Sequence, residues 1–280
     1  MIFLKRKITA IILAFLFLNI EIYHAQNKVI DSLNLSIKTD NSGLDKMNSL
    51  NALSWEHLKI GNSDSAINAS NRALLLAKDL PEVDRQRGNA QSFANIAMAN
   101  ADKGNFSDAI TYFLKALKIG EDLGNKIIIS NNLSNISNVY GSMGEYDKSL
   151  ESLLRAMKIA EELGDKKSVA TDLGNIGNLY DLKNETTKAL EYYQKALEIC
   201  KELNYRPGIG TNLGNIGLVY SKLGQKEKAL TNYIQSLIIA KEGGDQRSIA
   251  ISEGNIGELY IQLLTEAAPS EKNDLSEKAE

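Results

Sequence analysis

The sequence repeats itself with a period of forty residues. An Asn-Ile pair followed by a small residue recurs five times at this spacing, beginning at Asn95, Asn135, Asn175, Asn215 and Asn255. In most copies a tyrosine lies four residues after the isoleucine, at Tyr140, Tyr180, Tyr220 and Tyr260. A period of this length indicates a stack of similar supersecondary units, in which each unit buries its apolar face against its neighbours.

Each unit divides into two predicted helices. In the copy that begins near Thr211, the apolar and small residues are Leu213, Ile216, Gly217 and Tyr220 in the first helix and Ala229, Leu230, Tyr233, Leu237 and Ala240 in the second. Spacings of mostly three and four residues place each set on one face of its helix. The chain has only 3 Pro, which favours helices over strands and turns.

A glycine or an asparagine marks the end of nearly every predicted helix. These residues are Gly61, Gly104, Gly144, Asn184 and Gly224 after the first helices, and Gly124, Gly164, Asn204 and Gly244 after the second helices. Glycine just past a helix readily adopts the left-handed conformation that turns the chain back, and asparagine tolerates it best among the other residues. The sequence therefore predicts an all-α fold, a solenoid of antiparallel helix pairs.

The motif Ile216-Gly217, Tyr220, Gly224 and Ala229 resembles the tetratricopeptide repeat in a forty-residue form. The resemblance covers roughly residues 46–280, as about five complete repeats plus a truncated sixth, and implies a right-handed superhelix. Residues 27–45 are expected to form an N-terminal capping helix. Because a polar capping helix is missing at the C-terminus, we expect the chain to be a fragment of a longer protein or the product of a truncated gene model.

The first 25 residues differ in kind from the repeats. Lys5, Arg6 and Lys7 precede an apolar run over residues 8–20. A helix of that length rises about 20 Å, short of the ~30 Å hydrocarbon core of a membrane. Residues 1–25 therefore predict a signal peptide, and the alternative is an uncleaved signal anchor. We expect an extracytoplasmic array, periplasmic or secreted. The alternative is an array tethered to a membrane through the N-terminus or a missing C-terminal segment.

The composition argues against several classes of function. The net charge is −3 and no basic cluster stands out, so nucleic acid is not an expected partner. A single cysteine, Cys200, and two distant histidines offer no metal site. There is no Gly-rich phosphate loop and no convergent nucleophile, histidine and acid. We expect no enzyme activity, and no catalytic, cofactor-binding or metal-binding residues.

A polar stripe runs beside the packing stripe on the first helices. Its members are Asn95, Asn135, Asn138, Thr171, Asn175, Asn178, Thr211, Asn215 and Asn255. In the tetratricopeptide family this side lines the concave groove that holds an extended peptide, so the resemblance implies a protein or peptide partner. An asparagine amide both donates and accepts, and can pair with the backbone of an extended chain. The alternative is that these amides bond the neighbouring helix pair and hold the superhelix together.

Two functions follow from this reading. The first is a protein-interaction scaffold that binds an extended peptide or a partner protein. The second is the sensory input region of a larger bacterial signalling protein, such as a histidine kinase, a nucleotide cyclase or a transcriptional regulator. The chain resembles the extracytoplasmic repeat regions of bacterial sensor proteins, which implies a role in signal transduction. A groove that clamps an acidic C-terminus is disfavoured, because the stripe largely lacks lysine and arginine.

Overall fold

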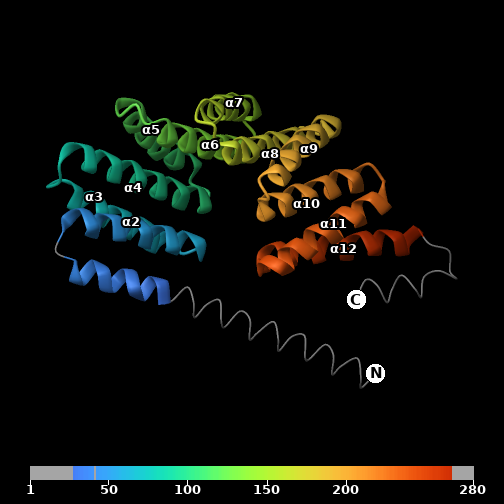
Figure 1. Ribbon diagram of the computed structural model, residues 1–280, viewed down its shortest axis with the longest axis horizontal. Helices are drawn as coiled ribbons and strands as arrows, with labels where there is room; N and C mark the ends of the chain where they lie inside the picture. Colours follow the sequence, from blue (N-terminus) through green and yellow to red (C-terminus); the bar gives the residue numbers. More distant parts are fainter. Residues whose placement is uncertain (1–27, 41, 267–280) are drawn as a thin grey trace, which may run out of the picture. The chain divides into compact units, whose positions relative to one another are not determined.

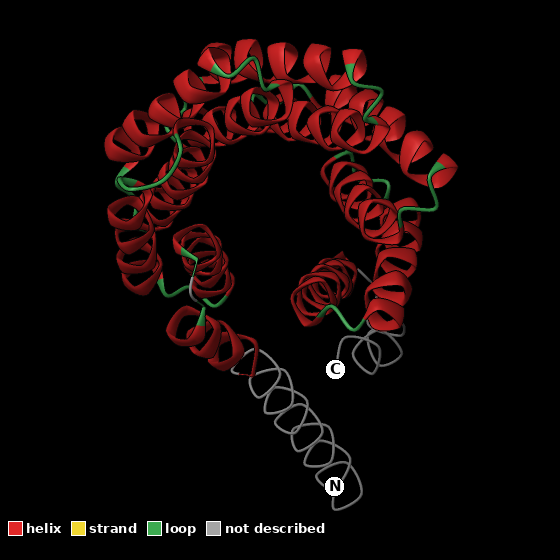
Figure 2. Ribbon diagram, turned by 60° about the vertical axis from the view of Figure 1, so that its left-hand side comes forward, coloured by secondary structure: helices red, strands yellow, loops and turns green. Residues whose placement is uncertain are grey.

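The computed structural model describes residues 28–40 and 42–266, and every regular element among them is a helix (Figure 2). Residues 28–39 are helical and are followed by the helices labelled in Figure 1. These are α2 (Gly43–Lys59), α3 (Ser63–Ala77), α4 (Glu82–Asp102), α5 (Phe106–Asp122), α6 (Lys126–Ser142), α7 (Tyr146–Glu162), α8 (Lys166–Leu182), α9 (Thr186–Glu202), α10 (Arg206–Lys222), α11 (Lys226–Gly243) and α12 (Gln246–Glu266). The predicted all-α fold is confirmed. The predicted signal peptide and the predicted second helix of the truncated sixth repeat lie outside the described residues.

The chain divides into two compact units, one ending at Asn135 and the other beginning at Ile136. Within the first unit α2 packs on α3, α3 on α4 and α4 on α5. Within the second unit the same sequential packing runs from α7 to α12. In addition α10 contacts both α8 and α12, whereas α9 and α11 make no such contact in the described part of the chain. The first helices of the second unit therefore lie closer together than its second helices, and their shared face is the inner one.

The turns between helices adopt the predicted left-handed conformation. All seven predicted glycines have positive φ, and so do the two asparagines, Asn184 at 59° and Asn204 at 50°. At the first of these turns the N–H of Asn184 donates to the Asp181 carbonyl at 3.0 Å, and the N–H of Glu185 donates to the Tyr180 carbonyl at 2.8 Å. These bonds satisfy carbonyl groups at the end of α8 that have no partner within the helix. The short turn returns the chain directly along the helix it has just left.

A glycine on each first helix allows a tyrosine of the second helix to lie directly against it. A β-carbon built on Gly177 would come within 2.7 Å of the Tyr193 ring, and one on Gly217 within 2.7 Å of the Tyr233 ring. Both tyrosines are 2% exposed, so these contacts form part of the core. At Gly257 on α12 no heavy atom of the described residues lies within 4 Å of such a β-carbon.

We predict that Gly217→Ala lowers the stability of the protein and that Gly257→Ala does not. Both substitutions gain the same helix propensity, so the difference between the two variants isolates the clash with Tyr233. Overpacking of this kind costs about 1–3 kcal/mol. Urea denaturation followed by circular dichroism measures the difference, and equal midpoints for the two variants would contradict the packing described here.

Candidate functional site

The structure places all nine predicted groove residues on first helices, but their exposure differs. Asn138, Asn178, Thr171 and Thr211 are exposed, Asn135, Asn175, Asn215 and Asn255 are half-buried, and Asn95 is buried. The two threonine hydroxyls donate to carbonyls one turn earlier, at Lys167 and Pro207, over 3.0 and 3.1 Å. Both threonines therefore already have a hydrogen-bond partner within their own helix.

Asn95 connects two repeats and is not open to a ligand. Its Nδ2 donates to the Asn51 carbonyl at 3.0 Å, and its Oδ1 accepts from Gln91 Nε2 at 2.9 Å. The Asn51 side chain in turn donates to the Gly88 carbonyl at 3.1 Å and accepts from the Ser92 hydroxyl at 2.7 Å. This network is buried between α2 and α4. At Asn95 the amide bonds the neighbouring helix pair, as the alternative interpretation of the stripe expects.

A hydrogen bond between the side-chain amides of Asn178 and Asn215 joins α8 to α10. Asn215 Nδ2 donates to Asn178 Oδ1 at 3.2 Å. The same oxygen accepts from the hydroxyl of Tyr193 at 2.7 Å, and burial raises the pKa of that tyrosine. The Asn178 oxygen is thus occupied twice, while its side chain remains exposed. The Asn178–Asn215 pair therefore joins two repeats and also presents the Asn178 amide to solvent.

Asn138 and Asn175 make no side-chain hydrogen bond to the described part of the chain. They line a hollow of about 700 Å³ together with Asn178, at the place where α6, α7 and α8 meet. We call this the polar hollow, defined by these three asparagines. Its apolar lining includes Leu153 and Leu182. The structure thus brings three predicted residues together around one cavity, and two of them have unused donors and acceptors.

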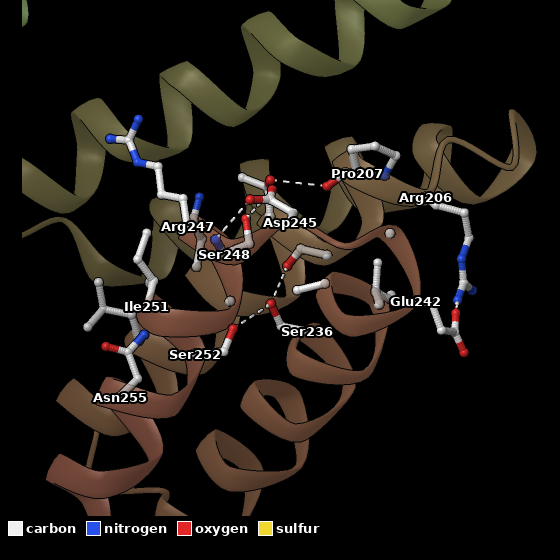
Figure 3. A pocket seen from close by; sticks show the side chains of 18 residues that line it. Arg206, Pro207, Ser236, Glu242, Asp245, Arg247, Ser248, Ile251, Ser252 and Asn255 are labelled. Carbon is white, nitrogen blue, oxygen red and sulfur yellow. Dashed lines mark hydrogen bonds and ion pairs between the residues drawn. The ribbon is translucent and has the colours of Figure 1, made fainter. Parts of the chain in front are cut away.

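A second hollow of about 700 Å³ lies between α10, α11 and α12 (Figure 3). Three predicted residues line it, namely Thr211, Asn215 and Asn255. Its walls also carry Leu218, Ile239 and Ile251, and we call it the apolar hollow after these three side chains.

The charged groups around the apolar hollow are largely neutralised. Arg206 forms an ion pair with Glu242 at one edge (Figure 3). The Asp245 carboxylate accepts from the backbone N–H of Ser248 at 3.1 Å and from its hydroxyl at 2.7 Å. These two bonds lower the pKa of Asp245, so its carboxylate is ionised at neutral pH and is held against the start of α12.

A third hollow, in the first unit, was missed by the sequence reasoning. It measures about 520 Å³ and is lined by α2 and α4. Trp55 lies in it with 46% of its surface exposed, beside Asn48 and Arg87. The signal was present in the sequence, because Asn48, Asn51 and Trp55 are spaced by three and four residues and so form a stripe on α2. That stripe lies beside the one formed by the packed residues Leu50 and Leu53.

Residues 28–40 and 42–266 contain no group of three or more metal-ligating side chains. None of the described helices has the length and apolar character needed to cross a bilayer. The single cysteine, Cys200, is buried, which raises its pKa, and its sulfur lies 3.9 Å from Asn212 Nδ2. Cys200 is therefore part of the packed core.

We predict that two asparagines in the same position of the repeat differ in their contribution to stability. Asn95→Ala removes the buried hydrogen bond to the Asn51 carbonyl and the partly buried one from Gln91, and losing both costs about 1–3 kcal/mol. Asn175→Ala removes no bond and should change stability by less than about 0.5 kcal/mol. Thermal or urea unfolding measures both. A large loss at Asn175 would show that its amide is structural as well.

Several solved structures share this fold at low sequence identity. BtubC from P. vanneervenii aligns with a TM-score of 0.65 and 18% identity, over 79% of this chain and 93% of that one. A signal transduction ATPase with a tetratricopeptide repeat sensor from Pyrococcus horikoshii aligns with a TM-score of 0.66 and 18% identity, over 94% and 40%. The Rap conjugation gene regulator of plasmid pLS20, in complex with the Phr* peptide, aligns with a TM-score of 0.62 and 15% identity, over 84% and 72%.

A search of curated proteins finds no match to the chain. Comparison with family models agrees with the structural likeness. Models of the tetratricopeptide repeat match residues 86–162, 128–202 and 211–241, which together make up more than half of the sequence. With the helix pairs, the left-handed turns and the packing described above, these matches show that the chain belongs to the tetratricopeptide repeat family.

Proposed function

We propose that this chain is a non-catalytic interaction scaffold, and that it binds an extended peptide or an extended segment of a partner protein. The binding surface is the face shared by the first helices of the second unit, across the polar hollow and the apolar hollow. The backbone groups of the partner pair with the asparagines of the polar stripe, which we call the amide stripe, and its side chains enter the hollows.

The observation that carries this proposal is the pair of unused amides in the polar hollow. Asn138 is exposed and Asn175 is half-buried, and neither side chain has a hydrogen-bond partner among the described residues. An amide side chain offers two N–H donors and one carbonyl acceptor, which match the N–H and C=O groups of a peptide backbone. Asn178 stands beside them and is held in place by Tyr193 and Asn215. The surface is therefore partly fixed in advance, which lowers the entropic cost of binding.

One structural neighbour favours a peptide as the partner. The Rap regulator of plasmid pLS20 was solved with the Phr* peptide bound, on a fold that spans 84% of this chain. At 15% identity that likeness concerns the fold, so the residues that bind a peptide in this chain are argued from its own geometry.

The second candidate function, a sensory input region, is favoured by a different neighbour. The Pyrococcus horikoshii ATPase carries repeats described as a sensor, and this chain aligns with 40% of its length. The same surface would then detect a ligand and report it to an output region. In either function we propose that residues 1–25 export the array, so that its partner is extracytoplasmic.

The binding proposal predicts that Asn138→Ala combined with Asn175→Ala weakens peptide binding. Peptides are first selected on the full chain from a random library, and their affinities are then measured by calorimetry. Loss of two hydrogen bonds worth about 1 kcal/mol each should lower affinity tenfold or more. The matched control is Asn232→Ala, which removes an asparagine from second helix α11, where its side chain donates only to the Lys228 carbonyl at 2.8 Å. Unchanged affinity in a folded double variant would refute binding by these amides.

The export proposal predicts that residues 1–25 direct a passenger across a membrane. Fused to an alkaline phosphatase that is active only after export, they should give active enzyme in a Gram-negative host. The same fusion with Leu13→Asp and Leu16→Asp breaks the apolar run and should be inactive. Activity that survives this change would show that the segment is not the export signal.

A further inference from the structure

We infer that the apolar hollow receives one bulky apolar side chain of the bound peptide, and that it thereby selects among peptide sequences. This inference rests on the proposed function and adds to it the chemistry of the ligand. The amide stripe pairs with backbone groups that every peptide has, so it is sequence-tolerant. Discrimination between peptides must then come from a site that reads a side chain.

Most polar groups of the apolar hollow already have partners, and Asn255 at its edge is an exception. The Ser236 hydroxyl donates to the Gly210 carbonyl at 2.8 Å and lies 3.3 Å from the Ser252 hydroxyl (Figure 3). Thr211, Asp245 and Glu242 are bonded as described above. Arg247 lines the hollow and its side chain is exposed. A polar ligand group would find few open partners here, whereas an apolar one leaves no buried polar atom unsatisfied.

The apolar walls are exposed in the absence of a ligand. Ile251 on α12 is 54% exposed and Leu218 on α10 is 38% exposed, and both line the cavity. The preceding repeats carry threonine at the position of Ile251, namely Thr171 and Thr211. Asn255 lies one turn along α12 from Ile251 (Figure 3) and makes no side-chain hydrogen bond among the described residues. An apolar side chain could thus enter the hollow while its backbone pairs with an asparagine at the edge.

The hollow exists because this repeat departs from the one before it. Forty residues earlier the corresponding side chains are larger, and the changes along the sequence are Cys200 to Ala240, Leu203 to Gly243, Tyr205 to Asp245 and Asn212 to Ser252. In the earlier repeat these side chains occupy the space beside the start of first helix α10. A β-carbon built on Gly208 would come within 2.5 Å of the Tyr205 ring and within 2.6 Å of the Cys200 sulfur. Glycine is needed there because the space is full, and at the same position α12 carries Ser248 beside an open cavity.

This difference supplies a variant that fills the hollow with side chains known to fit the repeat. The variant combines Ala240→Cys, Asp245→Tyr, Ser248→Gly and Ser252→Asn, and we call it the graft. Each substitution introduces the residue that the preceding repeat carries at that position. Circular dichroism checks that the graft folds.

The experiment selects peptides from a random library on the full wild-type chain and on the graft. Wild-type protein should enrich peptides with one position restricted to bulky apolar residues. Alanine at that position should lower the wild-type affinity about tenfold or more, since a buried Leu or Phe side chain accounts for that much binding. The graft should bind the parent peptide and its alanine variant equally.

The outcomes separate this inference from the proposed function. Enriched peptides without an apolar position, or a folded graft that still prefers the parent peptide, would overturn the inference and leave the scaffold proposal standing. Failure of both proteins to enrich any peptide would overturn both.

A milder variant covers the case in which the graft does not fold. Ile251→Thr places the threonine of the preceding repeats at an exposed position and should reduce the preference for the apolar peptide severalfold. Its matched control is Ile238→Thr, which changes an isoleucine that is 50% exposed on α11 and does not line the hollow. Equal effects of these two substitutions would contradict the assignment.

Discussion

The close approach of a first helix to its second helix, through a glycine that faces a tyrosine ring, is the contact on which the other features depend. Gly177 with Tyr193 and Gly217 with Tyr233 leave no room for a β-carbon. Since each helix pair is narrow, the next pair can stack directly against it, and the first helices of the second unit share a continuous face. The same tyrosine reaches that face, because the Tyr193 hydroxyl bonds Asn178. Packing in the core and order in the amide stripe are therefore produced by one side chain.

The amide stripe has two roles, and the structure separates them by position. Where an asparagine meets a backbone carbonyl or another amide of the neighbouring repeat, as at Asn95 and Asn215, it joins repeats. Where the side chain forms no hydrogen bond with the described residues, as at Asn138 and Asn175, it keeps its hydrogen-bonding capacity. Both roles use the same residue type because an amide can donate and accept at once. The free amides lie beside a hollow, and this is what connects the repeat architecture to peptide binding.

Features governed by local chemistry could be predicted from the sequence. The turns at Asn184 and Asn204 depend on which residues accept positive φ, and their positions were found without a structure. The sequence could not predict which asparagines of the stripe bond the neighbouring repeat and which remain open, because this depends on the groups that the neighbouring repeat places beside them. The turn glycines Gly61 and Gly104 are 43 residues apart instead of forty, and in this part of the chain Asn95 bonds the Asn51 carbonyl. The apolar hollow likewise arises from several small residues acting together, such as Ala240 and Ser252, none of which is unusual alone.

Binding of ligands on the face formed by the first helices is the central claim. The most direct test is a crystal structure of the full chain with a peptide selected from a random library. We expect the peptide to lie extended across α8, α10 and α12, with backbone groups on the asparagines and a side chain between α10 and α12. A peptide bound instead to the outer surfaces of α9 and α11 would contradict it.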